Sequence, residues 1–253
     1  MYSSLHLPRI ICLHGGGSNA RVFRSQMRVI ASRLHARFRL VYVDGPYESE
    51  AAQDVLPVFA TCGPFKSWIP GPSLVLSTED AATSSACLVT VARLVTAAME
   101  QDTLSYGATG DWVGILGFSQ GAKMAASLLL LQQECHHQGH ASERSWFPRH
   151  SFRFGVLMNG RGPLIQELLG PDQYERADTD PIKKPQLLSV PTLHVHGLED
   201  PGLEAHRAMR WDWCEQESTT VVEWQGGHRL PIRSADVNLV VDALVVLDKK
   251  TRY

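Results

Sequence analysis

Long apolar runs are missing from this sequence, in which no stretch approaches the roughly 18 consecutive apolar residues of a membrane-spanning helix. The apolar run between Leu5 and Leu13 contains Pro8 and Arg9 and leads directly into a glycine-rich turn that carries candidate catalytic groups. Removal of this run as a signal peptide would destroy that turn. We therefore expect no membrane association and a location in the cytoplasm.

Paired cysteines and a strong charge imbalance are missing too. The five cysteines include no Cys-x-x-Cys pair and are odd in number, which argues against a disulfide framework and favours a reducing compartment. The formal net charge is only −2, so the whole chain has no field that would draw it to nucleic acid or to an anionic membrane. The function must therefore be argued from local motifs.

Short β-rich apolar runs alternate with helical stretches along the chain, which is the pattern of a parallel sheet with crossover helices. With 253 residues, of which 44% are hydrophobic, the chain is large enough to bury a sizeable core. We predict an α/β fold with three layers and a mostly parallel sheet of about six strands, at residues 9–13, 39–43, 112–116, 153–158, 192–196 and 220–224.

Three helices are also predicted. The first has an apolar face formed by Phe23, Met27, Ile30 and Leu34. A second runs from Ser119 to about residue 133, and a third covers residues 237–247.

The chain contains no repeat, low-complexity tract or linker, so we predict one domain over residues 1–253. Two long segments without clear periodicity, at about 44–78 and 160–189, would leave the carboxyl ends of strands. Open α/β sheets bind ligands at those ends, so we assign both segments to the rim of a substrate pocket.

Residues 117–121 read Gly-Phe-Ser-Gln-Gly and lie between a predicted strand and a small-residue helix start. This is the context of a nucleophile elbow, in which glycines allow a tight strand-to-helix turn that exposes a serine hydroxyl. The five-residue pattern alone is weak, and Ser119 could simply cap a helix. The flanking strand and helix favour Ser119 as a nucleophile.

A serine hydroxyl needs a base, and the base needs a group that orients it. His228 follows a predicted strand on a flexible Gly-Gly turn, and Asp200 follows the preceding strand. Serine, acid and base then occur in the chain order of α/β-hydrolases. Glu199 is the alternative acid. The simpler interpretation of a loop histidine such as His228 is a solvated surface residue.

The tetrahedral intermediate needs hydrogen-bond donors for its oxyanion. Three glycines, residues 15–17, follow the first predicted strand, without the spacing of a phosphate-binding loop. We predict the backbone N–H groups of Gln120 and Gly16 as donors, with Gly17 as an alternative to Gly16. His14 is expected to brace this loop rather than to transfer protons.

The predicted substrate contacts are mostly apolar, as in most ligand pockets. They comprise Gly17, Phe59, Phe65, Trp68 and Leu230. The aromatic residues among them could instead tuck the first rim segment onto the core. No cofactor is predicted. We also predict no metal at the polar stretch of Cys135, His136, His137 and His140, because Gly139 interrupts the helix needed to hold His136 and His140 on one face.

The sequence resembles the fungal serine hydrolase family often called FSH, a branch of the α/β-hydrolases. The resemblance spans nearly the whole chain and rests on Leu-His-Gly at 13–15, Val-Asp-Gly-Pro at 43–46, the elbow at 117–121, Pro-Thr-Leu-His-Val-His-Gly at 191–197 with Asp200, and Gly227-His228 with Pro231. Residues 56–60 and 63–68 are similar to thioesterases that release products from polyketide synthases. Residues 158–160, Met-Asn-Gly, depart from the Ser-Gly expected in the broader family.

This resemblance implies a sheet shortened at its N-terminal side and the triad Ser119, Asp200 and His228. It implies a serine hydrolase that cleaves a small-molecule ester or thioester, with polyketide release from an acyl carrier protein as the expected role in fungal secondary metabolism. A short-chain carboxylesterase and a non-catalytic ligand-binding protein remain as alternatives.

The first 43 residues contain seven arginines and no Asp, Glu or Lys. A solvated helix face is the simpler interpretation. The alternative is that Arg21, Arg24 and Arg28 dock an acidic acyl carrier protein.

Overall fold

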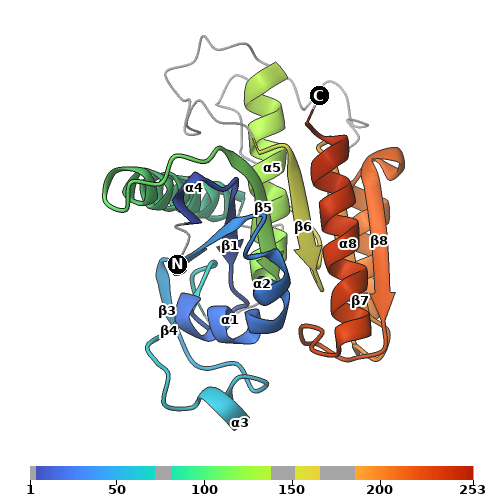
Figure 1. Cartoon of the computed structure of the whole chain (residues 1–253). Helices are drawn as coiled ribbons and strands as arrows, with labels where there is room; N and C mark the ends of the chain where they lie inside the picture. Colours follow the sequence, from blue (N-terminus) through green and yellow to red (C-terminus); the bar gives the residue numbers. More distant parts are fainter. Residues whose placement is uncertain (1–3, 72–80, 138–151, 166–185, 253) are drawn as a thin grey trace, which may run out of the picture.

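The computed structural model describes residues 4–71, 81–137, 152–165 and 186–252. Its main sheet has six parallel strands in the order β2-β1-β5-β6-β7-β8 (Figure 1). The predicted parallel sheet of about six strands is confirmed. In chain order its strands are β1 (Arg9–Leu13), β2 (Arg39–Val43), β5 (Trp112–Phe118), β6 (Phe154–Met158), β7 (Thr192–Gly197) and β8 (Thr219–Trp224).

The four central strands, β1, β5, β6 and β7, are buried along their whole length. Such burial requires helices on both faces of the sheet and explains why these strands read as continuous apolar runs rather than as alternating ones. The edge strand β8 is partly exposed.

One face of the sheet is covered by α1 (Ala20–Gln26), α2 (Arg28–Leu34) and α8 (Ser234–Lys250). The first predicted helix is in fact two short helices that meet at Met27. Its predicted apolar face is nevertheless buried, with Phe23, Met27, Ile30 and Leu34 at most 1% exposed. The side chain of Asn19 caps α1 by accepting a hydrogen bond from the N–H of Val22.

The other face is covered by α4 (Ala81–Leu104), α5 (Gln120–His137) and α7 (Leu203–Trp213), whose apolar residues form a second core cluster. The helices α4 and α7 are not among the predicted elements. Together with the sheet, the two helical faces give the predicted three-layer architecture.

The first rim segment contains structure of its own. It forms an antiparallel pair of short strands, β3 (Tyr47–Ser49) and β4 (Phe65–Ser67), with the short helix α3 (Leu56–Phe59) between them. Lys66 in β4 binds the glycine loop after β1 through two backbone hydrogen bonds, to Gly17 and to Ser18. Of the second rim segment, residues 166–185 lie outside the described residues.

Short 3₁₀ turns complete the described elements, at Ser4–His6 and Gln216–Ser218. Asp102 at the end of α4 is 2% exposed and binds the guanidinium groups of both Arg9 and Arg39. Two of the seven N-terminal arginines thus have a structural partner. No helix in the described ranges is both long and apolar enough to cross a membrane.

Candidate active site

Ser119 lies at the junction of β5 and α5, in the left-handed backbone conformation with φ of 54°. Only a tightly constrained turn holds a serine there. The turn is tight because a Cβ on Gly117 would overlap the carbonyl of Gly121, and a Cβ on Gly121 would overlap the carbonyl of Leu13. The Ser119 N–H donates to the carbonyl of Met158, 2.8 Å away, which ties the turn to β6.

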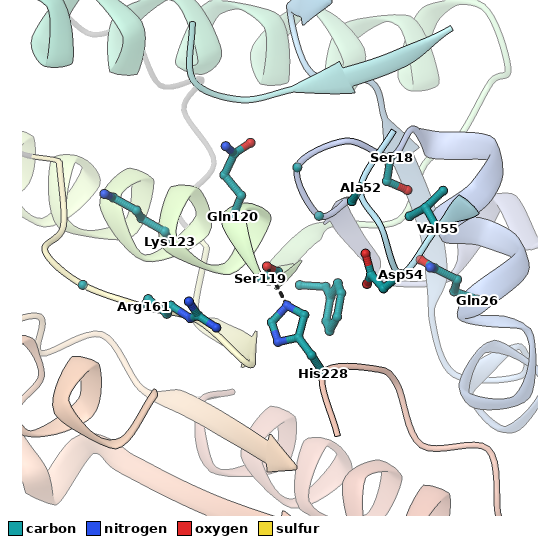
Figure 2. A pocket seen from close by; sticks show the side chains of 14 residues that line it. Ser18, Gln26, Ala52, Asp54, Val55, Ser119, Gln120, Lys123, Arg161 and His228 are labelled. Atoms are coloured by element: carbon teal, nitrogen blue, oxygen red, sulfur yellow. Dashed lines mark hydrogen bonds between the residues drawn. The ribbon is translucent and has the colours of Figure 1, made fainter. Parts of the chain in front are cut away.

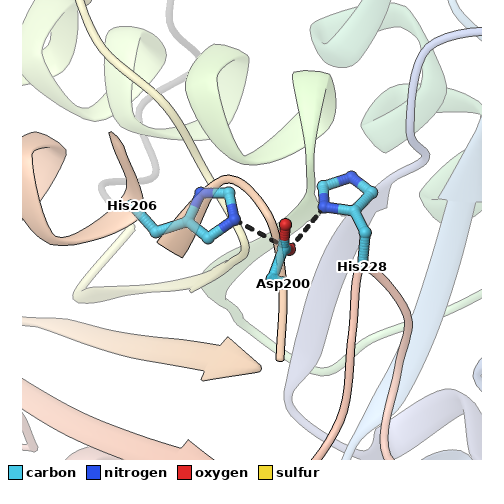
Figure 3. A group of neighbouring side chains, drawn as sticks. All are labelled: Asp200, His206 and His228. Atoms are coloured by element: carbon cyan, nitrogen blue, oxygen red, sulfur yellow. Dashed lines mark hydrogen bonds and ion pairs between the residues drawn. The ribbon is translucent and has the colours of Figure 1, made fainter. Parts of the chain in front are cut away.

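His228 bridges this serine and a buried carboxylate. Its Nε2 lies 2.9 Å from Oγ of Ser119 (Figure 2), and its Nδ1 lies 2.6 Å from Oδ2 of Asp200 (Figure 3). The neutral tautomer that fits these contacts donates from Nδ1 to the carboxylate and accepts the serine hydroxyl at Nε2. The alternative acid, Glu199, is exposed, whereas Asp200 is 4% exposed.

Asp200 accepts four hydrogen bonds. The Gly202 N–H binds Oδ1 at 2.8 Å, while Oδ2 accepts from Asn159 at 2.5 Å as well as from His228 and His206. Burial alone would raise the pKa of Asp200, but these donors outweigh it and hold the pKa below its ordinary value. Asp200 is therefore an anion at neutral pH.

His206 in α7 is fully buried on the side of Asp200 opposite His228 (Figure 3). Its Nε2 lies 2.8 Å from Oδ2 of Asp200, and its Nδ1 lies 2.9 Å from the carbonyl of Gly160. Burial lowers the pKa of His206, and the two acceptors at its nitrogens oppose that effect. In either protonation state Nε2 carries a hydrogen, because a bare nitrogen would face the anion.

Neither His206 nor Asn159 is among the predicted site residues. Asn159 directly follows β6 and has φ of 52°, so its position at a strand end was the available signal. His206 lies in a helix with no motif around it, and nothing in the sequence singles it out.

Asp200, His206 and His228 also form the one group of three potential metal ligands within the described ranges. Both imidazoles and the Asn159 amide lie within 2.8 Å of a single carboxylate oxygen. These distances between nitrogen and oxygen atoms are those of hydrogen bonds. A bound metal ion would instead lie between the ligand atoms, about 2 Å from each of them. The predicted absence of metal also concerned His140, which lies outside the described residues.

The glycine loop after β1 presents amides to the serine. The N–H groups of Gly16 and Gln120 have no intramolecular acceptor among the described residues, and both residues line the cavity at Ser119. The Gly17 N–H differs, because it donates to the carbonyl of Lys66 at 3.0 Å. Of the predicted oxyanion donors, Gly16 and Gln120 are thus available and Gly17 is occupied.

His14 holds this loop in place. It donates from Nδ1 to the carbonyl of Gly15 at 2.7 Å and accepts the N–H of Gly45 at Nε2, 2.9 Å away. Burial lowers the pKa of His14 to about 4, so the ring is neutral at pH 7. Both nitrogens are engaged, which suits a bracing role.

A cavity of about 330 Å³ opens at Ser119 (Figure 2). Both rim segments contribute to it: Ala52, Asp54 and Val55 come from the first, and Arg161 and Gly162 from the second. Gln26 of α1 and Lys123 of α5 complete its polar lining.

Comparison with known proteins agrees with this geometry. The profile of the family described as "Serine hydrolase (FSH1)" matches residues 3–240. This chain belongs to that family. Esterase dbaE of Emericella nidulans is 42% identical over 98% of the chain and 93% of that relative, and esterase claE of Penicillium crustosum is 40% identical over 98% and 96%.

Solved structures show the same fold. Esterase PE8 superposes with a TM-score of 0.54 at 16% identity, covering 96% of this chain and 93% of that one. The carboxylesterase of Bacillus cereus gives 0.55 at 14% identity, covering 95% and 89%. The predicted α/β-hydrolase fold and the predicted resemblance to the FSH family are both confirmed, and the chain is an enzyme of the serine hydrolase class.

In this FSH-family member, the predicted substrate contacts lie outside the lining of the cavity. Trp68 is 0% exposed and donates from its indole N–H to the carbonyl of His14. Its backbone N–H binds the side-chain oxygen of Gln120, so Trp68 braces the elbow instead of forming a substrate wall. Leu230 packs in the core beside α8. Gly17, Phe59 and Phe65 are likewise absent from the lining.

Proposed function

We propose that this chain hydrolyses an acyl ester or thioester through an acyl-enzyme formed on Ser119. The observation that carries the proposal is the continuous hydrogen-bond chain from Ser119 through His228 to Asp200, with separations of 2.9 and 2.6 Å. The strained elbow conformation of Ser119 and the two unoccupied amides beside it supply the remaining parts of an acyl-transfer site.

Acylation begins when the Ser119 oxygen attacks the carbonyl carbon and neutral His228 takes the hydroxyl proton at Nε2. The oxyanion of the tetrahedral intermediate accepts the N–H groups of Gly16 and Gln120. The Asp200 carboxylate stabilises the imidazolium. When the intermediate collapses, the bond to the leaving group breaks and the alcohol or thiol departs with the proton from His228, which leaves the imidazole neutral for deacylation.

Deacylation repeats the sequence with water. His228 takes a proton from the water as its oxygen attacks the acyl carbon, and the Ser119 oxygen leaves with that proton. The carboxylic acid is released and the site is restored. Asn159 and His206 act as positioning residues in both halves, because they hold the Asp200 carboxylate that orients the base.

We further propose that the acyl group is delivered by an acyl carrier protein, as in polyketide release. The similar motifs at residues 56–60 and 63–68 support this, as does α1, where Gln26 lines the cavity and the neighbouring Arg21, Arg24 and Arg28 are exposed. The Arg24 guanidinium also lies over the ring of Tyr42, 5.2 Å from its centroid, so that side chain has a structural contact as well. Exposed basic side chains close in sequence to the cavity-lining Gln26 would steer an acidic carrier.

The test of the chemistry is covalent labelling with a fluorophosphonate, followed by intact-protein mass spectrometry. Wild type should gain one adduct, Ser119→Ala none, and Ser18→Ala, which removes the other serine of the cavity, one. Turnover by Ser119→Ala should fall about 10⁴-fold or more. Labelling of Ser119→Ala at the wild-type rate would refute the assignment, and binding without any adduct in wild type would favour a non-catalytic protein.

Matched ester and thioester pairs of increasing acyl length then test the substrate. A preference for long thioesters supports polyketide release, whereas a preference for short oxygen esters identifies a general carboxylesterase.

The docking of a carrier protein is tested by changing Arg21, Arg24 and Arg28 together to Glu. The control changes Lys249 and Lys250, at the exposed end of α8, to Glu. At low salt the triple variant should lose turnover of carrier-bound thioester, and unchanged turnover would end the docking proposal.

A further inference from the structure

Lys123 has an unusual position for a lysine. It lies four residues after Ser119 in the first full turn of α5, and its N–H donates to the Ser119 carbonyl at 3.2 Å. Ser119 is in the left-handed conformation just before the helix, so the two residues lie at the same end of α5. Lys123 lines the same cavity but is only 7% exposed.

The ammonium group of Lys123 has no hydrogen-bond or ion-pair partner among the described residues. Burial lowers the pKa of Lys123, and the nearest compensating group is Cys87. Burial raises the pKa of the Cys87 thiol to about 11, so Cys87 is uncharged at neutral pH and gives no counter-ion. A cation without a counter-ion at the wall of a cavity favours an anionic ligand there, because hydrogen bonds between charged groups are stronger than neutral ones.

A second cation lines the cavity on the same side. Arg161 follows β6 after Gly160, and its guanidinium lies directly against Gly202, where a Cβ would overlap Nη2. Within the described ranges it too forms no ion pair. Figure 2 shows Lys123 and Arg161 to one side of Ser119, and Asp54, the one carboxylate among the described lining residues, on the other.

We propose that Lys123 and Arg161 form a subsite for an anionic oxygen group of the substrate, which makes the enzyme selective for acyl compounds with a negative charge on that side of the scissile carbonyl. The inference rests on the proposed function, since Ser119 fixes where the carbonyl lies. Two sources share this chemistry: a carboxylate or enolate on the acyl group, and a phosphate on the leaving group.

Two substrate pairs separate these sources. The acyl pair is mono-4-nitrophenyl adipate against its methyl ester, which differ only in the distal charge. The leaving-group pair is the acetyl thioester of 4′-phosphopantetheine against that of pantetheine. In wild type, kcat/KM for the charged member of one pair should exceed that of its neutral partner about 10- to 100-fold, as for other hydrogen bonds to charged groups.

The variants are Lys123→Met, Arg161→Met and both together, with Lys249→Met as a control that removes an exposed charge. The ratio of kcat/KM for the charged substrate to that for the neutral substrate should fall about 10-fold in Lys123→Met and further in the double variant. It should return to the wild-type value in Lys123→Arg. The control Lys249→Met should leave it unchanged. The melting temperature of Lys123→Met should equal or exceed that of wild type, because the variant removes a partly desolvated cation that has no counter-ion among the described residues.

Charge-independent turnover by wild type in both pairs, or a ratio unaffected by the double variant, would overturn the inference. Fluorophosphonate labelling of Ser119 separates this from failure of the proposed function, because that reagent carries no acyl charge. An unlabelled, inactive wild type would refute the hydrolase proposal instead. In that case protection from thermal unfolding by monomethyl adipate, and its loss in the double variant, would still test the subsite.

Discussion

Nε2 of His206 lies 2.8 Å from the oxygen of Asp200 that also binds His228 at 2.6 Å. One carboxylate oxygen is thus held between two imidazoles, that of His228 in the site and that of His206, which is buried within α7. Because Asp200 orients the proposed base His228, we expect His206 to affect catalysis although it does not line the cavity.

Replacing His206 with Phe should lower kcat about 10- to 100-fold with little change in KM, because a charged acceptor loses one donor. His206→Gln retains a donor and should recover most of the rate. Steady-state kinetics on a neutral ester give the comparison, and circular dichroism checks that both variants fold. Equal rates in the two variants would show that His206 only fills space.

Asn159 offers a sharper test of charge. Asn159→Asp tolerates the left-handed backbone but places a second carboxylate 2.5 Å from Asp200. The two cannot both ionise, so they share a proton and the charge that supports His228 falls. We expect kcat to drop more than in Asn159→Gly, which removes only the donor, with the larger loss at low pH. A pH–rate profile of both variants measures this, and identical profiles would contradict it.

Neighbouring glycines should respond differently to alanine. Gly17 has φ of 66° and its added Cβ would overlap the backbone of Ala52, so Gly17→Ala should lower the free energy of unfolding by about 1–3 kcal/mol. At Gly16 the Cβ would lie 3.1 Å from the Gln120 side chain, which disturbs the amides without breaking the fold. Gly16→Ala should lower kcat roughly 10-fold or more. Urea titration of both variants measures the free energy of unfolding, and steady-state kinetics measures kcat.

Buried histidines predict acid sensitivity. Burial lowers the pKa of His14 and His196 to about 4 and that of His194 to about 3, while an unfolded histidine titrates near pH 6.5. Between about pH 6.5 and 4 the unfolded chain therefore binds more protons, and the free energy of unfolding falls as the pH falls, by up to about 1.4 kcal/mol per pH unit for each group. His194→Gln should flatten that slope. A melting temperature constant over this range would contradict the prediction.

The proposed nucleophile, base and acid could be predicted from sequence because each follows a parallel strand, and the carboxyl ends of parallel strands share one sheet edge. Ser119, Asp200 and His228 needed only the strand assignments and the chain order. The proposed oxyanion donor at Gly16 followed from the same reasoning, since Gly16 lies in the loop after β1.

The surroundings of that site are less readable. His206 reaches Asp200 from inside α7, and no sequence spacing connects a helix interior to a loop after a strand. Trp68 was expected in the pocket because aromatic side chains suit apolar ligands, but its indole N–H found a buried carbonyl at His14. The helix α4 is rich both in alanine, which favours helices, and in β-branched residues, which favour strands, so its composition does not indicate one element type.

The residues of the site come from two halves of the sheet. Ser119 and the glycine loop belong to the β1–β5 half of the sheet, and Asp200 and His228 to the β7–β8 half. The end of β6 joins them: Met158 receives the Ser119 amide, while Asn159 bonds through its amide to Val195 and through its side chain to Asp200. A displacement of one half by an ångström, too small to melt either, separates serine from imidazole. We therefore expect heat to abolish activity at a lower temperature than it unfolds the core.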